Sequence, residues 1–241
     1  VVGDASIVNG VSLEGINNAA LLRRQFLIVL NDNSMAIDRT HGAMARALDR
    51  IRMTPTYTGL RQSAENILHH LPLGQEISEA IKSIKAGLKA SIHGGQIFEG
   101  LGFEYFGPID GHNIHELIRV LTRLADIPRP VLLHVHTVKG KGYSPAEAHC
   151  SRLHGVPAFD LESGRPIEAP SGDTFTEAFG AAICRQAETR PEVVAISAAM
   201  CDGTGLAEFR QRFPARCFDV GMAEEHAVTL AAGMACEGLR P

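Results

Sequence analysis

Two short apolar runs, each followed by a polar side chain, constrain the fold of this chain more than any other feature. Residues 1–3 lead into Asp4, and residues 27–30 lead through two polar residues into Asn33. Such runs are typical of buried parallel strands, and residues 13–22 between them have helical spacing. The sequence therefore predicts a strand–helix–strand unit, in which the carboxyl ends of neighbouring strands share one sheet edge, where ligands bind.

The two polar groups suit a metal ion with a phosphate ligand. A carboxylate and an amide oxygen are ligands that Mg²⁺ prefers, and this ion keeps room for substrate phosphates. We therefore interpret Asp4 and Asn33 as candidate magnesium ligands beside a diphosphate. The alternative is a pair of turns, because Gly-Asp and Asn-Asp-Asn are common turn sequences. The pair alone leaves both interpretations open.

The composition narrows the class of partner. The 241 residues are 45% hydrophobic and 21% charged with a net charge of −4, which is enough for one large or two modest domains. No basic cluster indicates a nucleic-acid partner, and no apolar run approaches the length of a membrane span. The five cysteines form no Cys-x-x-Cys pair, so we expect neither a zinc site nor a disulfide framework, and we infer a reducing compartment.

The hydrophobic spacing predicts an α/β architecture in two parts with a long connection. In the first part we expect strands at 25–30, 104–106 and 131–138, and helices at 11–24, 42–51, 77–88 and 114–124. Residues 144–172 carry several Pro and Gly residues, which indicate an interdomain linker. In the second part we expect helices at 175–187, 206–213 and 225–236, and strands at 193–197 and 217–220.

Longer motifs carry a family resemblance. Gly3-Asp4 followed by Asn33 resembles the thiamine-diphosphate fingerprint, whose usual form is Gly-Asp-Gly, a spacer and then Asn-Asn or a variant. Four more motifs follow in order, namely Gly107-Pro108-Ile109-Asp110-Gly111-His112, Thr137-Val138-Lys139-Gly140-Lys141-Gly142-Tyr143, His154-Gly155-Val156-Pro157 and Phe218-Asp219-Val220-Gly221-Met222-Ala223-Glu224-Glu225-His226-Ala227. Over essentially its whole length the chain resembles the 1-deoxy-D-xylulose-5-phosphate synthase family, a relative of transketolase.

The resemblance implies a fold and an activity. The fold would be a parallel-sheet thiamine-diphosphate-binding α/β fold, with a diphosphate-binding domain at 1–143, the linker at 144–172 and the start of a pyrimidine-binding domain at 173–241. The enzyme would be a transferase that condenses pyruvate with D-glyceraldehyde 3-phosphate and releases CO₂. Its product, 1-deoxy-D-xylulose 5-phosphate, would feed isoprenoid, thiamine and pyridoxal synthesis. The resemblance further implies thiamine diphosphate and Mg²⁺ as cofactors, a cytoplasmic homodimer, and no nucleic-acid or membrane partner.

The resemblance also assigns residues to the metal and the diphosphate. Mg²⁺ would be bound by the side chains of Asp4 and Asn33 and by the backbone carbonyl of Met35. Ala5 and Ser6 would lie against the diphosphate, where backbone N–H groups at the start of a helix suit an anion. The usual third residue of the fingerprint is Gly, and Ala5 would be strained there only if its backbone were left-handed. We expect the change to be benign.

The remaining site residues are assigned in the same way. Glu224 would hydrogen-bond the aminopyrimidine ring and promote activation of the cofactor, a role that a dry site favours. Tyr143 would lie against the cofactor. Lys139 would orient the diphosphate or the substrate, with an ordinary exposed lysine as an equal alternative. His154 would take part in proton transfer or in binding an intermediate, because imidazole titrates near neutral pH.

Other functions remain as alternatives. Transketolase and 2-oxo-acid dehydrogenases share the cofactor chemistry, although the motifs at 139–143 and 154–157 argue against them. A non-catalytic α/β cofactor-binding module is an alternative of a different class. Because the chain begins within a predicted strand and ends where another would follow, we expect an internal piece of a longer enzyme. We expect this piece alone to be inactive and poorly folded, since its sheets would have unpaired edges.

Overall fold

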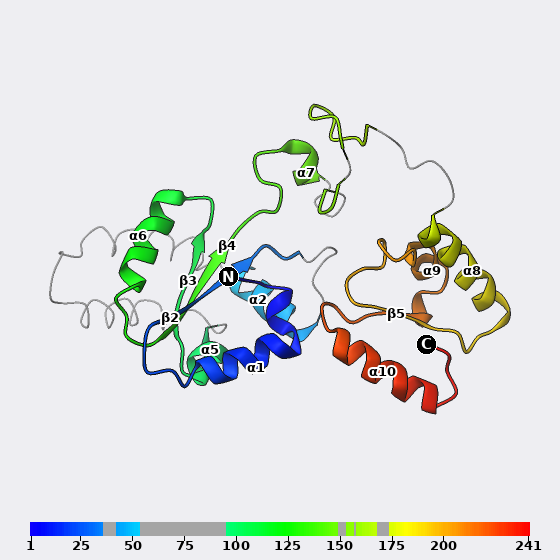
Figure 1. The fold of residues 1–241 in the computed structure, drawn as a ribbon, viewed down its shortest axis with the longest axis horizontal. Helices are drawn as coiled ribbons and strands as arrows, with labels where there is room; N and C mark the ends of the chain where they lie inside the picture. The colour runs from blue at the N-terminus through cyan, green and yellow to red at the C-terminus, as the bar shows by residue number, and fades with distance from the viewer. Residues whose placement is uncertain (36–41, 54–94, 149–152, 157, 168–173) are drawn as a thin grey trace. The chain divides into compact units, whose positions relative to one another are not determined.

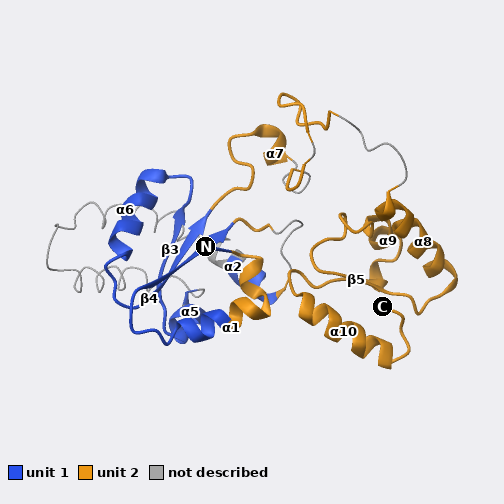
Figure 2. Cartoon of the chain, viewed as in Figure 1, with its two compact units in different colours: residues 1–2, 15–32, 43–136 blue, residues 3–14, 33–42, 137–241 orange. Residues whose placement is uncertain are grey.

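The structure is a computed structural model that describes residues 1–35, 42–53, 95–148, 153–156, 158–167 and 174–241. It divides into two compact units (Figure 2). Unit 1 comprises residues 1–2, 15–32 and 43–136, and unit 2 comprises residues 3–14, 33–42 and 137–241. The helix expected at 77–88 lies outside the described residues.

The described residues contain both helices and strands throughout the chain (Figure 1). The first part contains β1 (Val2–Gly3), α1 (Gly10–Ala19), β2 (Phe26–Asp32), α2 (Ala43–Met53), α5 (Gln96–Leu101), β3 (Glu104–Asp110), α6 (Ile114–Leu124) and β4 (Pro130–His136). The second part contains α7 (Ser144–Ala148), α8 (Phe175–Thr189), β5 (Ala195–Ser197), α9 (Ala207–Arg212), β6 (Cys217–Asp219) and α10 (Glu224–Cys236). Two 3₁₀ turns span Ser6–Val8 and Pro214–Arg216.

A parallel sheet organises the first part of the chain. Its strand order is β1–β2–β4–β3, and β4 pairs in parallel with both β2 and β3. Phe26 is paired with Pro130 and Asp32 with His136, so β2 and β4 end together. This arrangement confirms the expected α/β class with a parallel sheet.

Strand β3 is longer than the sequence predicts. We expected it at 104–106, yet it continues through Gly107 and Pro108, which are uncommon within strands, to Asp110, with a change of register between Phe106 and Ile109. A Cβ atom at Gly107 would lie 2.3 Å from the carbonyl oxygen of His134. Only glycine allows the two backbones to approach this closely. The irregularity carries the strand onward to Asp110.

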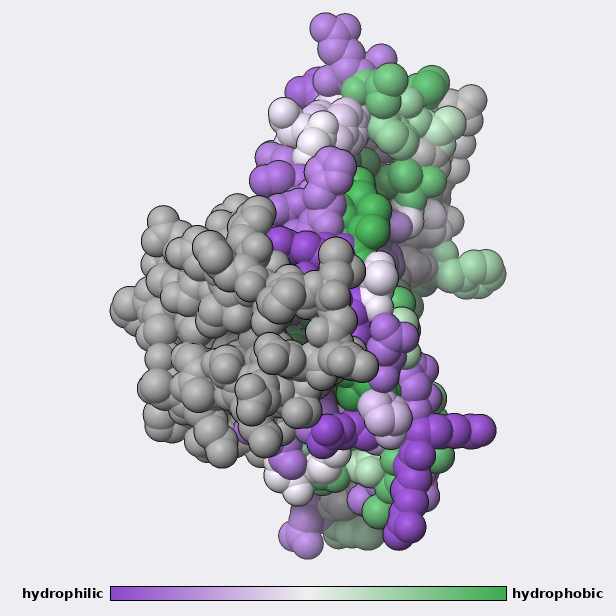
Figure 3. Space-filling view, turned by 90° about the vertical axis from the view of Figure 1, so that its left-hand side faces the viewer, coloured by the Kyte–Doolittle hydropathy of each residue, from purple (hydrophilic) through white to green (hydrophobic). Residues whose placement is uncertain are grey.

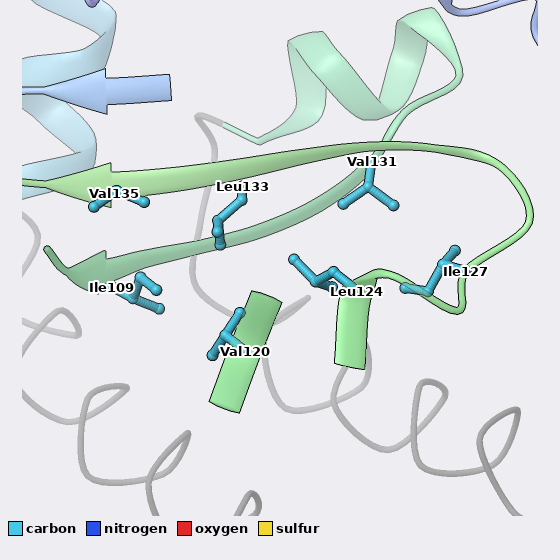
Figure 4. Packing of buried hydrophobic residues seen from close by; sticks show 7 residues of the cluster. All are labelled: Ile109, Val120, Leu124, Ile127, Val131, Leu133 and Val135. Carbon is cyan, nitrogen blue, oxygen red and sulfur yellow. The ribbon is translucent and has the colours of Figure 1, made fainter. Parts of the chain in front are cut away.

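Helix α6 and the sheet enclose a hydrophobic core in the described part of unit 1 (Figure 4). Asn113 caps the N-terminus of the helix, and its side chain accepts the backbone N–H of Glu116 at 3.1 Å. The apolar face of α6 packs against strands β3 and β4. The buried cluster consists of Ile109, Val120, Leu124, Ile127, Val131, Leu133 and Val135.

A buried polar chain also lies within unit 1. The Tyr105 hydroxyl is 2.7 Å from His134 Nδ1, and His134 Nε2 is 3.0 Å from Asp32 Oδ2. The side chains of His134 and Asp32 are fully buried. Because a carboxylate only accepts, His134 Nε2 donates to Asp32, and with one ring proton its Nδ1 accepts from Tyr105. Burial first, and the nearby Asp32 charge second, raise the pKa of Tyr105 above its ordinary value.

We expect the His134→Leu substitution to destabilise unit 1 by about 3 kcal/mol, because it removes the hydrogen-bond partner of both the Tyr105 hydroxyl and the buried Asp32 carboxylate. The change would be measured as a lower midpoint of urea unfolding, with the transition monitored by a spectroscopic probe placed within unit 1. His115→Leu is the matched control, since His115 is exposed on α6 and should leave the midpoint nearly unchanged. An equal effect of the two substitutions would contradict a stabilising role for the buried chain.

Unit 2 contains a smaller parallel sheet. Strands β5 and β6 pair with Ser197 opposite Asp219. Helix α8 begins with a capping box, in which Thr174 and Glu177 satisfy each other's backbone N–H groups. Its buried residues pack with Ala195 of β5 and Phe209 of α9. The expected linker contains a short helix, α7, which its Pro-rich composition did not indicate.

The surface mixes residue types. The face drawn in Figure 3 carries hydrophobic residues interspersed among hydrophilic ones. Some large apolar side chains are largely exposed to solvent, such as Phe175 at 98% and Val228 at 72% exposure. Among the residues that the structure describes, no helix is both long and apolar enough to cross a membrane.

Candidate functional site

Asp4 and Asn33 lie together in unit 2. The backbone N–H of Asn33 donates to Asp4 Oδ1 at 3.4 Å, and Asp4 is only 3% exposed. Asn33 Oδ1 accepts the backbone N–H of Met35 at 3.0 Å. This contact holds the segment after β2 in a tight turn, so the Met35 backbone stays next to the Asn33 side chain.

These groups fit a hard divalent cation. The described residues contain no group of three His, Cys, Asp or Glu side chains that could hold a metal. A magnesium site does not need such a group, because it takes one or two carboxylates and fills its other positions with neutral oxygens and substrate phosphates. The buried Asp4 carboxylate could supply the charge, and the amide oxygen of Asn33 and the backbone carbonyl oxygen of Met35 could supply neutral donors.

The backbone of Ala5 is right-handed. Its φ is −74° and its ψ is −38°, and it directly precedes the 3₁₀ turn Ser6–Val8. A Cβ atom is unstrained in this conformation, so the position does not require the glycine of the usual fingerprint. Ala5 is 8% exposed and packs against Ala199 and Met222. The Cβ atom thus fills a small apolar contact within unit 2.

Glu224 is the first residue of α10, on the segment that follows β6. Asn9 Nδ2 lies 3.4 Å from Glu224 Oε2 and 3.4 Å from Glu225 Oε2. Ser6 Oγ donates to Met222 Sδ at 3.8 Å. The loop that carries Glu224 therefore contacts the segment directly after Asp4, although more than 200 residues separate them in sequence.

Glu224 is exposed, in contrast to the dry environment that its expected role favours. It is one of the residues that line a shallow, open cavity of about 710 Å³ within unit 2. The cavity opens beside the carboxyl end of β5 and is lined by α8, β5 and the loop that follows. Its apolar lining includes Phe175, Phe179, Ile196, Met200 and Leu206. A flat heterocycle could bind there beside a carboxylate.

Lys139 and His154 form a second contact between expected site residues, and Tyr143 lies on the segment after β4 that also carries Lys139. Lys139 Nζ lies 3.1 Å from His154 Nδ1. An ammonium group only donates, so His154 Nδ1 accepts and the ring proton lies on Nε2. The Tyr143 hydroxyl donates to the backbone carbonyl of Leu161 at 2.8 Å, and its ring lies 6.2 Å from that of Phe159. Tyr143 thus anchors the following loop in this structure.

Three residues that contact expected site residues were not assigned a role from the sequence, namely Asn9, Ala199 and Met222. A fourth, Asp219, binds the backbone of Ala199. Asp219 had a usable signal, because it is a carboxylate at the end of a strand, as are the polar groups after β1 and β2. Asn9 and Ala199 had none, because their importance comes from contacts between segments that are distant in the sequence.

Comparisons with known proteins match both parts of the chain. A family model described as 1-deoxy-D-xylulose-5-phosphate synthase matches residues 1–137, and a model described as the pyrimidine binding domain of transketolase matches residues 172–241. Proteins named 1-deoxy-D-xylulose-5-phosphate synthase from Clostridium acetobutylicum, Anaeromyxobacter sp. strain K and Carboxydothermus hydrogenoformans are 43%, 46% and 46% identical over the whole chain.

The chain spans about two fifths of the length of these relatives, 39%, 38% and 39% respectively. Among solved structures, transketolase from Leishmania mexicana matches with a TM-score of 0.34 and 13% identity, over 93% of this chain and 38% of that one. That likeness is too low to carry an argument.

Proposed function

Because this chain belongs to the 1-deoxy-D-xylulose-5-phosphate synthase family, we propose that the full-length protein condenses pyruvate with D-glyceraldehyde 3-phosphate. The products are 1-deoxy-D-xylulose 5-phosphate and CO₂, and the sugar phosphate serves isoprenoid, thiamine and pyridoxal synthesis. The proposal includes a homodimer in the cytoplasm. It also includes a diphosphate-binding domain at 1–143, a linker at 144–172 and a pyrimidine-binding domain at 173–241.

One observation carries this proposal. The segment after Asp4 packs against the loop that leads into Glu224, through the contacts of Ala5 and Ser6 with Met222. A cofactor that needs a metal-bound diphosphate at one end and a carboxylate at the other requires these two segments to be neighbours. The contacts bring them together within unit 2.

The residues at the diphosphate end would bind and orient. Asp4, Asn33 and the carbonyl of Met35 would hold Mg²⁺, and the backbone N–H groups of Ala5 and Ser6 would face the diphosphate. When bound, thiamine diphosphate supplies a nucleophilic carbon and a reservoir for the electron pair released with CO₂. The protein contributes position and electrostatics.

The residues at the other end would handle protons. Glu224 would hold a proton at the aminopyrimidine ring, and the ring would cover a carboxylate that is exposed in this structure. His154 would present its Nε2–H group to the substrate, with Lys139 fixing that orientation by its contact at Nδ1. Tyr143 would support the loop that carries His154, through its bond to Leu161.

The proposal is tested by labelled pyruvate. The full-length protein with both cofactors should release ¹³CO₂ from [1-¹³C]pyruvate and form the sugar phosphate in equal amounts when glyceraldehyde 3-phosphate is present. A transketolase would instead use ketose phosphate donors, and a 2-oxo-acid dehydrogenase component would pass the two-carbon unit to a lipoyl acceptor. The sugar phosphate carries no label, because C1 of pyruvate leaves as CO₂. Absence of both ¹³CO₂ and the sugar phosphate would rule out the proposed reaction.

We expect His154→Ala to lower kcat about 100-fold, because it removes a positioned proton donor. The thermal midpoint should change little, since the His154 side chain is exposed. His112→Ala is the control, because His112 is also exposed but belongs to the turn after β3. A normal kcat in the His154 variant would remove that residue from the proposed mechanism.

A further inference from the structure

Asp219 ties together the two strand ends beside Glu224. It is the last residue of β6, and its Oδ1 accepts the backbone N–H of Ala199 at 2.9 Å and that of Gly221 at 3.0 Å. Its Oδ2 has a longer contact of 3.9 Å with Cys201 Sγ. One carboxylate oxygen thus bridges the loop after β5 and the loop after β6. Backbone N–H groups bind a charged acceptor more strongly than a neutral one.

The loop that Asp219 holds has a strained backbone. Ala199 has a φ of +59°, a conformation that L-residues other than glycine rarely adopt. It is only 1% exposed and packs against Ala5 and Met222. A strained conformation persists only where its surroundings hold it, and the hydrogen bond from Ala199 to Asp219 is one of the contacts that hold it, beside the bond from the backbone N–H of Met200 to Ser197 Oγ at 3.1 Å. The carboxylate thereby helps to fix the position of Ala199, against which Ala5 packs.

The second loop leads directly to Glu224. Gly221 has a φ of +73°, and Met222 follows with its contact to Ser6. Helix α10 then begins at Glu224, which lies beside Asn9. The path from the Asp219 carboxylate to Glu224 is therefore short and passes through residues that touch the segment after Asp4.

We propose that Asp219 is a positioning residue. Through its hydrogen bonds to the backbone of Ala199 and Gly221, it fixes the position of Glu224 relative to the segment after Asp4. This inference rests on the proposed role of Glu224. Asp219 does not touch the cofactor in this assignment, because its Oδ1 is occupied by two backbone N–H groups. Its Oδ1 acceptor, which bridges the two loops, sets the position of another carboxylate.

The test compares three variants of the full-length protein. Asp219→Ala removes the bridge, and Asp219→Asn keeps an oxygen acceptor without the charge. Asp202→Ala is the matched control, since Asp202 lies in the loop after β5, pairs with Arg210 at 3.1 Å and is 68% exposed. Two quantities are measured for each: amide hydrogen exchange of residues 197–203 and 219–226 without cofactor, and exchange of the thiazolium proton of bound thiamine diphosphate.

We expect Asp219→Ala to speed amide exchange in both segments and to slow thiazolium proton exchange about 100-fold, the size of effect that a displacement of about 1 Å produces. Asp219→Asn should recover most of both quantities, and Asp202→Ala should leave both unchanged. A merely structural role would lower the thermal midpoint of Asp219→Ala without slowing thiazolium exchange in the folded protein, and that result would overturn the inference.

Two further variants separate the possible failures. Ala199→Gly combined with Asp219→Ala should partly restore thiazolium exchange, because glycine adopts a positive φ without a clamp. The double variant and Asp219→Asn keep the test decisive if Asp219→Ala does not fold, and no recovery in either would count against the inference.

Glu224→Gln is measured in parallel. Normal exchange there would defeat the proposed function, whereas slow exchange there with normal exchange in the Asp219 variants would defeat only the positioning role.

Discussion

Replacing Glu224 by Gln in the full-length protein is expected to lower kcat about 1,000-fold, within the usual range for loss of a positioned proton-transfer group. The amide keeps the size of the side chain and much of its hydrogen bonding, but it cannot share a proton with the aminopyrimidine ring. Cofactor affinity should fall far less than kcat, because the diphosphate end supplies most of the binding. Steady-state kinetics and thiazolium proton exchange would measure the two effects.

Glu225 provides a control that is unusually well matched. It is the next residue of α10, it is exposed, and it receives the same 3.4 Å contact from Asn9 Nδ2. Glu225→Gln should therefore reproduce every change in local charge and in the Asn9 contact while leaving kcat nearly normal. If the two substitutions had equal effects, the charge at the start of α10 would matter and the specific role of Glu224 would be lost.

Asp4→Ala is expected to abolish magnesium-dependent cofactor binding, with an affinity at least about 100-fold weaker, because it deletes the charged ligand of an ion with strict geometry. Asn33→Ala should act in the same direction and less strongly, since it removes a neutral oxygen and the contact with Met35. Calorimetric titration of thiamine diphosphate with and without Mg²⁺ measures both variants. The dependence on Mg²⁺ should disappear in Asp4→Ala.

Asp110→Ala is the comparison for the metal site. Asp110 also ends a strand of the parallel sheet, but its Oδ1 accepts the backbone N–H of His112 at 2.9 Å in a turn. Its removal should leave the magnesium dependence intact. A magnesium dependence that survived in Asp4→Ala, or that was lost equally in Asp110→Ala, would contradict the assignment of Asp4 as a ligand.

The sequence predicts the regular elements of this fold well where one local pattern dominates. Helix α6 was expected at 114–124 and spans Ile114–Leu124, because its apolar spacing and the Asn113 cap agree. Strands β2 and β4 were expected within a few residues, since they are continuous apolar runs buried in a parallel sheet. Helix α10 was expected from residue 225 and begins one residue earlier.

Elements that depend on distant contacts were predicted less well. Strand β3 continues through Gly107 because the backbone of β4 lies against it, and that neighbour is invisible in a local pattern. Helices α5 and α7 have six and five residues, too few for a period to be recognised. The polar chain from Tyr105 to Asp32 was missed for the same reason, as its residues come from three different strands.

The candidate site, too, has some features that a local sequence pattern predicts and others that depend on distant contacts. The proximity of Asp4 and Asn33 follows from two apolar runs, each ended by a polar residue, in neighbouring strands. The effect of Ala5 could not be decided from the sequence, because it depends on a backbone angle that only the structure gives. The contacts of Asn9 with Glu224 and of Ala5 with Ala199 join segments about 200 residues apart, which no local pattern predicts.

The most direct test is a structure of the full-length protein with thiamine diphosphate and Mg²⁺ bound. We expect the metal to contact Asp4, Asn33 and the carbonyl of Met35, and the aminopyrimidine ring to contact the Glu224 carboxylate, so that one cofactor spans the contact between the segment after Asp4 and the loop before α10. A cofactor bound elsewhere, or a ring that lies away from Glu224 while the metal is in place, would contradict the proposed site.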